Sequence, residues 1–239
     1  MRPLLQPGTR AGTSSAKISR EHTVASPVPG LTVIAGGKLT THRVMAEDAV
    51  DFALGDAQAR RLPSITERIR LVGAEGHEVL RRRSGRIAAH YGWSEATVDH
   101  LLHRYGALLT DLTDLVDAQP DLGRPLELAP ASLRAEVDYA AADEGVLHLE
   151  DVMVSRTRMV YEQSDKGLGA VPEIADLVAE RLGWSAERRA AEIAAYRSRC
   201  EAQDRAVLQL DDAAAEAEQS RATDLAPLVP MAPSGVAGS

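Results

Sequence analysis

A short segment, Gly36-Gly37-Lys38-Leu39-Thr40, carries the residue types in this chain that are best suited to chemistry. Glycines let the backbone approach a ligand closely because they have no Cβ. A helix that begins just after them would present unpaired N–H groups with partial positive charge, and Lys38 would add a full charge. Such a corner suits a phosphate, a carboxylate or an electron-rich ring edge. A plain strand–turn–helix corner with a surface lysine fits the same spacing, so the spacing alone leaves both interpretations open.

The elements that would position this segment are a strand before it and a helix after it. Residues 31–35 form an apolar, β-branched run, which predicts a buried strand. Apolar residues at helical spacing from Met45 to Ala53 predict a helix that ends near Gly55. Residues 6–30 are rich in Pro, Gly, Ser and Thr, which indicates an irregular segment.

The rest of the chain, from about residue 63, has a helical apolar pattern. Ser94 and Ser185 are suited to cap helices, Pro172 to begin one and Gly183 to end one. Residues 210–239 have no aromatic residue and several prolines, which predicts a disordered tail. The fold class we expect is mainly α: a helical bundle preceded by a small α/β remnant of strand, Gly-Gly turn and helix.

Composition narrows the class of protein. Aromatic residues make up 3% of the 239 residues, so a core of Ala, Leu, Val and Ile in helices is favoured over a β-sandwich. The net charge of −8 argues against nucleic acid as a partner. A single cysteine, Cys200, excludes an internal disulfide, and the histidines show no spacing typical of metal ligation.

The lack of targeting signals indicates where in the cell we expect the protein. No apolar run approaches the ~18–20 residues that span a bilayer, and the N-terminus lacks the apolar region of a secretory signal. We therefore expect a cytoplasmic protein, with peripheral attachment to the inner face of the cell membrane left open. The triplet Arg81-Arg82-Arg83 could contact anionic lipid headgroups or could form a solvated helix face.

A series of motifs runs in order along residues 2–205. They are RPLL at 2–5, ISREH at 18–22, AGGKLTTHRVMAEDAVD at 35–51, LVGAEG at 71–76, RYG at 104–106, RAEV at 134–137, LEDV at 149–152 and RTR at 156–158. In wording and order these motifs resemble the FAD-dependent glycerol-3-phosphate dehydrogenases of the membrane-associated, quinone-linked type. His42 departs from the family, which usually has tyrosine there, and we interpret it as a first-turn residue of the helix without a catalytic role.

The resemblance implies roles for three cationic side chains. Arg2, Arg20 and Lys38 would lie near the substrate, sn-glycerol 3-phosphate, with Lys38 at the junction of substrate and flavin. Guanidinium forks suit a phosphate dianion. The product would be dihydroxyacetone phosphate, and electrons would pass to quinone.

The resemblance also implies a cofactor, FAD. The turn residues Gly36, Gly37, Leu39 and Thr40, together with Lys38, would contact its flavin ring. The family's catalytic base is expected in another part of the enzyme, so we assign no catalytic residue in this chain.

The same resemblance implies that further polypeptide is needed to bind FAD. Family members bind the ADP part of FAD with a G-x-G-x-x-G turn, and this sequence contains none. We therefore expect residues 1–57 to be the end of a flavin and substrate domain, 64–209 to be a helical C-terminal domain, and 210–239 to be the tail. A missing FAD-binding half, in cis or as a separate chain, would complete the enzyme, and this chain alone would bind FAD weakly or not at all.

Three alternatives stay open. The chain could be a non-catalytic helical interaction module, or a truncated gene product. A glycerophosphate oxidase that uses oxygen shares the motifs, and nothing in this part of the sequence separates quinone from oxygen as acceptor.

Overall fold

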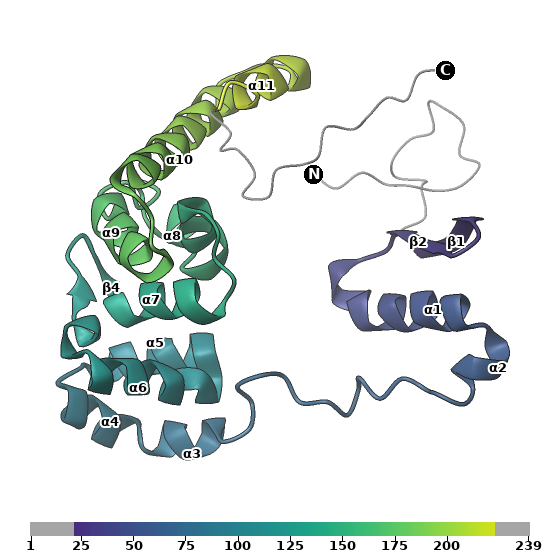
Figure 1. Ribbon diagram of the computed structural model, residues 1–239, viewed down its shortest axis with the longest axis horizontal. Coiled ribbons are helices and arrows are strands. Elements are labelled where there is room, and N and C mark those ends of the chain that lie inside the picture. Colours follow the sequence, from purple (N-terminus) through teal and green to yellow (C-terminus); the bar gives the residue numbers. More distant parts are fainter. Residues whose placement is uncertain (1–21, 223–239) are drawn as a thin grey trace. The chain divides into compact units, whose positions relative to one another are not determined.

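The structure, a computed structural model, describes residues 22–222. Helices predominate in this part of the chain, accompanied by two small two-stranded sheets, which confirms the mainly α fold class. The chain divides into two compact units, with the boundary between Leu71 and Val72 (Figure 1). The assignment of 1–57, 64–209 and 210–239 to a flavin-domain remnant, a helical domain and a tail stays a prediction.

The first unit begins with a β-hairpin. Strands β1 (His22–Val28) and β2 (Leu31–Gly36) pair antiparallel, with Val28 opposite Leu31 across a Pro29-Gly30 turn. Gly30 has φ +82°, which is the conformation that the second central residue of a type II turn requires. The prediction of an irregular segment was therefore wrong for residues 22–28, because a Pro-Gly turn between two β-branched runs is a hairpin signal.

Helices follow the hairpin in the first unit. They are η2 (Leu39–Thr41), α1 (His42–Leu54) and α2 (Asp56–Ala59). Gly55 ends α1 with φ +75°, as the sequence predicts. The prediction that strand 31–35 is buried was wrong, because Leu31 and Val33 are 48% and 42% exposed.

The second unit is helical. Its elements are α3 (His77–Arg82), α4 (Ser84–Tyr91), α5 (Glu95–Tyr105), η3 (Gly106–Leu108), α6 (Leu109–Ala118), η4 (Pro120–Gly123), β3 (Pro125–Leu126), β4 (Ala129–Leu133), α7 (Arg134–Asp143), the π-helix η5 (Asp151–Arg156), α8 (Met159–Glu162), α9 (Val171–Leu182), α10 (Ala186–Val207) and α11 (Asp212–Gln219). Ser94 and Ser185 accept hydrogen bonds from the backbone N–H three residues later, which confirms both predicted N-caps. Gly183 ends α9 in the left-handed conformation, also as predicted.

Two apolar clusters form the core of the second unit. One is built from α4, α5, α6 and α7, with Leu101 and Leu112 fully buried. The other is built from α7, the π-helix, α9 and α10, with Met153 and Ile174 fully buried. Because α7 contributes to both clusters, it joins the two halves of this unit, and Figure 1 shows it packed beside α9.

Two glutamates lie inside this unit, each paired with a half-buried histidine. Glu136 is fully buried and accepts hydrogen bonds from His100 Nε2 (2.9 Å), from the Tyr105 hydroxyl (3.2 Å) and from the backbone N–H at the start of α7. Glu192 pairs in the same way with His148 Nδ1 at 2.9 Å. The hydrogen bond to Glu136 raises the pKa of His100, although burial opposes this effect. Both carboxylates are therefore compensated, as buried charges must be.

Two predicted motifs meet through their glycines. The Gly73 carbonyl accepts a hydrogen bond from the Ala107 N–H at 2.7 Å. A Cβ on Gly73 would lie 2.4 Å from the Tyr105 carbonyl oxygen. A Cβ on Gly106 would lie 2.4 Å from the Gly73 carbonyl oxygen. LVGAEG and RYG therefore serve a close backbone contact in the helical unit, which only glycine permits.

Helix α11 corrects the predicted disordered tail. The Asp211 side chain accepts a hydrogen bond from the Ala214 N–H and caps this helix. Arg205 of α10 pairs with Glu218 of α11 at 3.0 Å. Composition alone missed the cap and the neighbouring helix, so the prediction was wrong for residues 212–219. The remainder of the predicted tail, 223–239, lies outside the described residues.

Candidate functional site

The predicted Gly-Gly corner forms where β2 meets η2 and α1. Gly36 and Gly37 have φ values of +82° and +75°, a conformation that other residues adopt only with strain. A Cβ on Gly37 would lie 2.5 Å from Met45 Sδ and 3.2 Å from His22 Cβ. Glycine at 37 therefore lets the turn pack directly against the first turns of α1 and the start of β1.

A hydrogen bond that the sequence did not predict connects two elements of the corner. His22 Nε2 of β1 and Asp48 Oδ2 of α1 lie 2.6 Å apart. His22 is also opposite Gly36 in the hairpin, so this pair links the end of β2 to α1. The two residues are 26 positions apart, and only the hairpin, which the sequence analysis missed, brings them together.

The side chains after the glycines are exposed. Leu39 is 68% exposed, and Lys38 and Thr40 are exposed as well. Within residues 22–222, the Lys38 ammonium has no ion-pair partner, although its backbone carbonyl accepts hydrogen bonds from the Thr41 N–H and hydroxyl at 3.1 and 3.0 Å. This leaves the lysine charge available to a ligand at the corner.

His42 has a structural use in the first turn of α1. Its Nδ1 lies 3.0 Å from the Leu39 carbonyl oxygen, and because a carbonyl can only accept, Nδ1 carries the hydrogen. The contact supports our interpretation of His42 as a first-turn residue, since the ring is engaged with the backbone of the turn.

Five predicted contact residues lie together at the corner, and two lie outside the described residues. Gly36, Gly37, Lys38, Leu39 and Thr40 are consecutive and surround the start of α1. The predicted substrate-binding residues Arg2 and Arg20 precede residue 22, so their approach to Lys38 stays a prediction.

The unit that carries this corner has an open apolar surface. None of residues 22–71 is buried. Its exposed large apolar residues are Val28, Leu31, Val33, Ile34, Leu39, Val44, Val50, Phe52, Leu54, Leu62, Ile65, Ile69 and Leu71. A hollow of about 490 Å³ lies between α1 and residues 62–69, and Val50, Leu62 and Ile65 contribute to its lining. An exposed apolar surface of this extent is typical of an interface.

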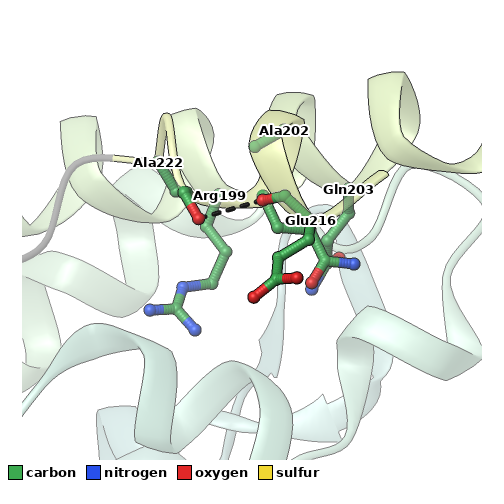
Figure 2. Close-up of a pocket in the computed structure, with 7 residues that line it drawn as sticks. Arg199, Ala202, Gln203, Glu216 and Ala222 are labelled. Carbon is green, nitrogen blue, oxygen red and sulfur yellow. Dashed lines mark hydrogen bonds between the residues drawn. The ribbon is translucent and has the colours of Figure 1, made fainter. Parts of the chain in front are cut away.

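A second hollow, between α10 and α11, is less suited to a ligand. Arg199, Gln203 and Glu216 contribute to its lining, and the Ser220 hydroxyl donates to the Glu216 carbonyl oxygen (Figure 2). Arg199 is already paired with Glu150 at 3.0 Å. We therefore interpret this hollow as the seam between two packed helices.

Two observations concern the membrane contact that the sequence left open: the pairing of the triplet Arg81-Arg82-Arg83, and the length and polarity of the helices. Arg81 and Arg82 both donate to Glu78, which lowers the pKa of that carboxyl to about 2. Two of the three cations are therefore already engaged on the helix surface. Between residues 22 and 222, no helix is both long enough and apolar enough to cross a membrane.

Comparison with known families identifies the class of protein. The C-terminal domain of alpha-glycerophosphate oxidase matches residues 64–189, more than half of the 239 residues. The chain belongs to this family, and it carries the C-terminal domain that glycerol-3-phosphate dehydrogenases and oxidases share.

The relatives of this chain are glycerol-3-phosphate dehydrogenases. It is 45% identical over 218 residues to a glycerol-3-phosphate dehydrogenase of Mycobacterium leprae, a match that covers 90% of this chain and 36% of the relative. It is 43% identical over 235 residues to glycerol-3-phosphate dehydrogenase 2 of Mycobacterium tuberculosis, covering 95% of this chain and 39% of the relative. The mitochondrial enzyme of Rattus norvegicus is 31% identical over 197 residues, covering 81% and 26%. The chain thus spans little more than a third of the length of its bacterial relatives.

Proposed function

We propose that this chain supplies the C-terminal part of an FAD-linked enzyme that oxidises sn-glycerol 3-phosphate to dihydroxyacetone phosphate and passes electrons to quinone. The family match and the dehydrogenase relatives support this proposal. The chemistry of the Lys38 corner supports it as well, because an exposed cation and the start of a helix suit both a phosphate ester and an electron-rich ring.

The corner residues fit the two proposed ligands. The Lys38 ammonium would pair with the substrate phosphate, and Arg2 and Arg20 would approach the same group. Gly36, Gly37, Leu39 and Thr40 would lie against the flavin ring of FAD. The start of α1 would stabilise negative charge that develops there. FAD, when bound, would supply the hydride acceptor, and the chain's own residues would bind and orient.

The observation that carries the proposal is the open apolar surface of residues 22–71. A unit in which no described residue is buried gains little from the hydrophobic effect by itself. The same unit carries the exposed Lys38. We infer that the FAD-binding part of the enzyme covers this surface and brings flavin and substrate to the corner.

A chimera tests this function. The segment of the Mycobacterium tuberculosis relative that matches this chain is replaced by the chain itself, which preserves the covalent order of the enzyme. We expect the purified chimera to carry FAD and to reduce a dye when glycerol 3-phosphate is added. Lys38→Met should lower dye reduction at least tenfold and raise the KM, because the phosphate loses a paired charge.

The matched control is Arg61→Gln, which removes one exposed charge from the same unit. It should leave dye reduction near the unsubstituted level. A chimera that folds and binds FAD but does not oxidise glycerol 3-phosphate would contradict the proposed function and favour the interaction module. Flavin bound in stoichiometric amount by the 239-residue chain alone would contradict the inferred need for another part.

A second candidate is a glycerophosphate oxidase, because the matching domain is described from such an enzyme. The two candidates differ only in the electron acceptor. Hydrogen peroxide formed in air, in equal amount to the glycerol 3-phosphate consumed, would identify the oxidase. Reduction of a quinone analogue without peroxide would identify the dehydrogenase.

A further inference from the structure

Three arginines line one hollow in the helical unit, remote in sequence from the Lys38 corner. Arg104 is on α5, Arg156 ends the π-helix η5, and Arg158 directly precedes α8. The hollow has a volume of about 460 Å³. The other residues that line it are His100, His103, Tyr105, Glu144, Ser155 and Glu162.

None of these three guanidinium groups forms an ion pair or hydrogen bond within residues 22–222. Other arginines of the helical unit are paired at short range: Arg134 with Glu173 at 2.8 Å, and Arg188 with Glu192 at 3.3 Å. Most other arginines of this unit have carboxylate partners, whereas these three have none in the described residues and line one hollow.

Arg156 has a buried nitrogen without a partner. Its Nε is shielded from solvent and forms no hydrogen bond in the described structure. A buried donor left unpaired is costly, and in native proteins such a group commonly has an acceptor such as an ordered water or a bound ion. The orphaned donor lies in the same residue that lines the hollow.

The backbone around Arg156 and Arg158 has an unusual conformation. The Thr157 N–H and hydroxyl both donate to the Val152 carbonyl oxygen at 2.8 Å, which closes the π-turn. Arg158 has φ +62°, in the left-handed region that few residues other than glycine adopt. Short π-helices recur at functional sites. Thr157 and Met159 point into the core and are buried, whereas the arginines on either side of Thr157 line the hollow.

Carboxylates in the lining do not cancel the positive charge. Glu136 is buried, does not line the hollow, and accepts hydrogen bonds from His100 and Tyr105. Burial raises the pKa of Glu144, although Arg156 and Arg104 oppose this effect. Glu162 is the second carboxylate of the lining. Three permanent cations thus face two carboxylates.

We propose that this hollow binds a phosphate monoester dianion. Several guanidinium forks give a dianion more charge-assisted hydrogen bonds than a single carboxylate can accept, and Arg is the residue best suited to this geometry. The volume falls within the range of small-molecule sites. The phosphate could belong to a soluble compound or to a lipid headgroup, since both present the same group. This site does not rest on the proposed oxidation reaction.

Titration of the purified 239-residue chain with inorganic phosphate, followed by calorimetry at low ionic strength, tests the site. We expect saturable binding that becomes at least tenfold weaker in the double variant Arg104→Gln/Arg158→Gln. Arg158→Lys, which keeps the charge but loses the fork, should weaken binding to a smaller extent. The control Arg82→Gln/Arg86→Gln changes the net charge equally on exposed residues and should bind as the unsubstituted chain does.

A second arm distinguishes the source of the phosphate. Vesicles of phosphatidylcholine with phosphatidic acid are sedimented with the chain and with the same variants. Saturable binding of inorganic phosphate without vesicle binding assigns a soluble ligand. Vesicle binding that the Arg104→Gln/Arg158→Gln variant loses and the control keeps assigns a lipid headgroup.

Three results would overturn the proposal: no binding in either arm, equal weakening in variant and control, or full binding retained in the double variant. Far-UV circular dichroism checks that the double variant is folded. If it is not, the single variant Arg158→Lys decides the matter, because this exposed side chain keeps its charge. A loss of binding in Arg104→Gln/Arg158→Gln, both in the helical unit, assigns the phosphate to this hollow rather than to the Lys38 corner.

Discussion

The apolar side chains of residues 22–71 are exposed, whereas those of residues 72–222 pack into two clusters. None of residues 22–71, the described part of the first unit (here the hairpin unit), is buried, although its strands and helix have regular hydrogen bonding. In the helical unit Leu101, Leu112, Met153 and Ile174 are fully buried. Local signals for strand, turn and helix are therefore sufficient to form these elements. Among residues 22–222, a core forms where apolar faces of several helices meet, which happens in the second unit.

The difference also separates the two candidate sites. In our proposal the Lys38 corner acts only when other polypeptide covers residues 22–71. The arginine hollow lies on a unit with its own core, so we expect it to bind a ligand in this chain alone. Substitutions in both units, each with a matched control, test this difference.

The largest expected effect comes from truncating one leucine in each unit. Leu112→Ala removes a fully buried side chain and should cost about 2–5 kcal/mol of unfolding free energy, through lost burial and the cavity left behind. Leu31→Ala, on a residue that is 48% exposed, should change it by less than about 0.5 kcal/mol. Urea unfolding followed by far-UV circular dichroism measures both. An equal cost for the two leucines would mean that the hairpin unit has a core of its own.

The next effect concerns the close contact of Gly73 with Gly106. Gly106→Ala would place a Cβ 2.4 Å from the Gly73 carbonyl oxygen, at a position with φ +60°. Gly92→Ala is the matched control, because Gly92 has φ +69° and nothing within 4 Å of the added Cβ. Both alanines suffer the strain of positive φ, but Gly106→Ala should cost roughly 1–3 kcal/mol more. The backbone must move to relieve the contact, and Gly106 has ψ −130°, outside the left-handed helical region in which Gly92 lies with ψ 21°. Similar melting temperatures for the two variants would show that the contact yields easily.

These contacts indicate how much of the fold could be predicted. Ser94, Ser185, Gly55 and Gly183 mark helix ends correctly because capping depends on residues within one turn of the chain. The exposure of β2 could not be predicted from its apolar run, since burial depends on what packs against the strand. The Pro29-Gly30 turn could have identified β1, but we predicted an irregular segment there because we considered its composition alone.

The candidate sites also combine features that local sequence predicts with features that depend on tertiary structure. The order of Gly36, Gly37 and Lys38 before a helix is local, and the structure has it. The His22–Asp48 pair is not local, because the hairpin must form first. Arg104 and Arg158 belong to two motifs that the sequence analysis noted separately, and only the packing of the helical unit brings them to one hollow. Sequence spacing carries no information on such a juxtaposition.

A smaller effect is expected from pH in the helical unit. The hydrogen bond to Glu136 raises the pKa of His100 above its ordinary value of 6.5, so the folded state binds this proton more tightly than the unfolded state. The resulting stability is fully present below the ordinary pKa and is lost as pH rises through the raised value. We expect the difference in unfolding free energy between the unsubstituted chain and His100→Gln to shrink over that range, by about 1 kcal/mol or less. Urea unfolding at a series of pH values measures it.

The matched control for this pH effect is His103→Gln. His103 is exposed, and its Nδ1 donates to the Asp99 carbonyl oxygen rather than to a carboxylate. The unfolding free energy of this variant should follow the same pH dependence as the unsubstituted chain. A pH dependence that His100→Gln leaves unchanged would place its origin in other groups.

The smallest effect tests where the helical unit ends. Asp211→Ala removes the side chain that accepts from the Ala214 N–H, and should destabilise α11 by about 1 kcal/mol. Asp212→Ala, on the first helical residue, loses only a favourable charge near the helix start and should cost less. Amide hydrogen exchange over residues 212–219 should quicken more in the first variant, while exchange in the core helices stays unchanged. If exchange in α11 is the same in both variants, then the Arg205–Glu218 pair and packing on α10 hold this helix, and the cap does not. In that case the helical unit extends to α11 through long-range contacts, which composition could not have predicted.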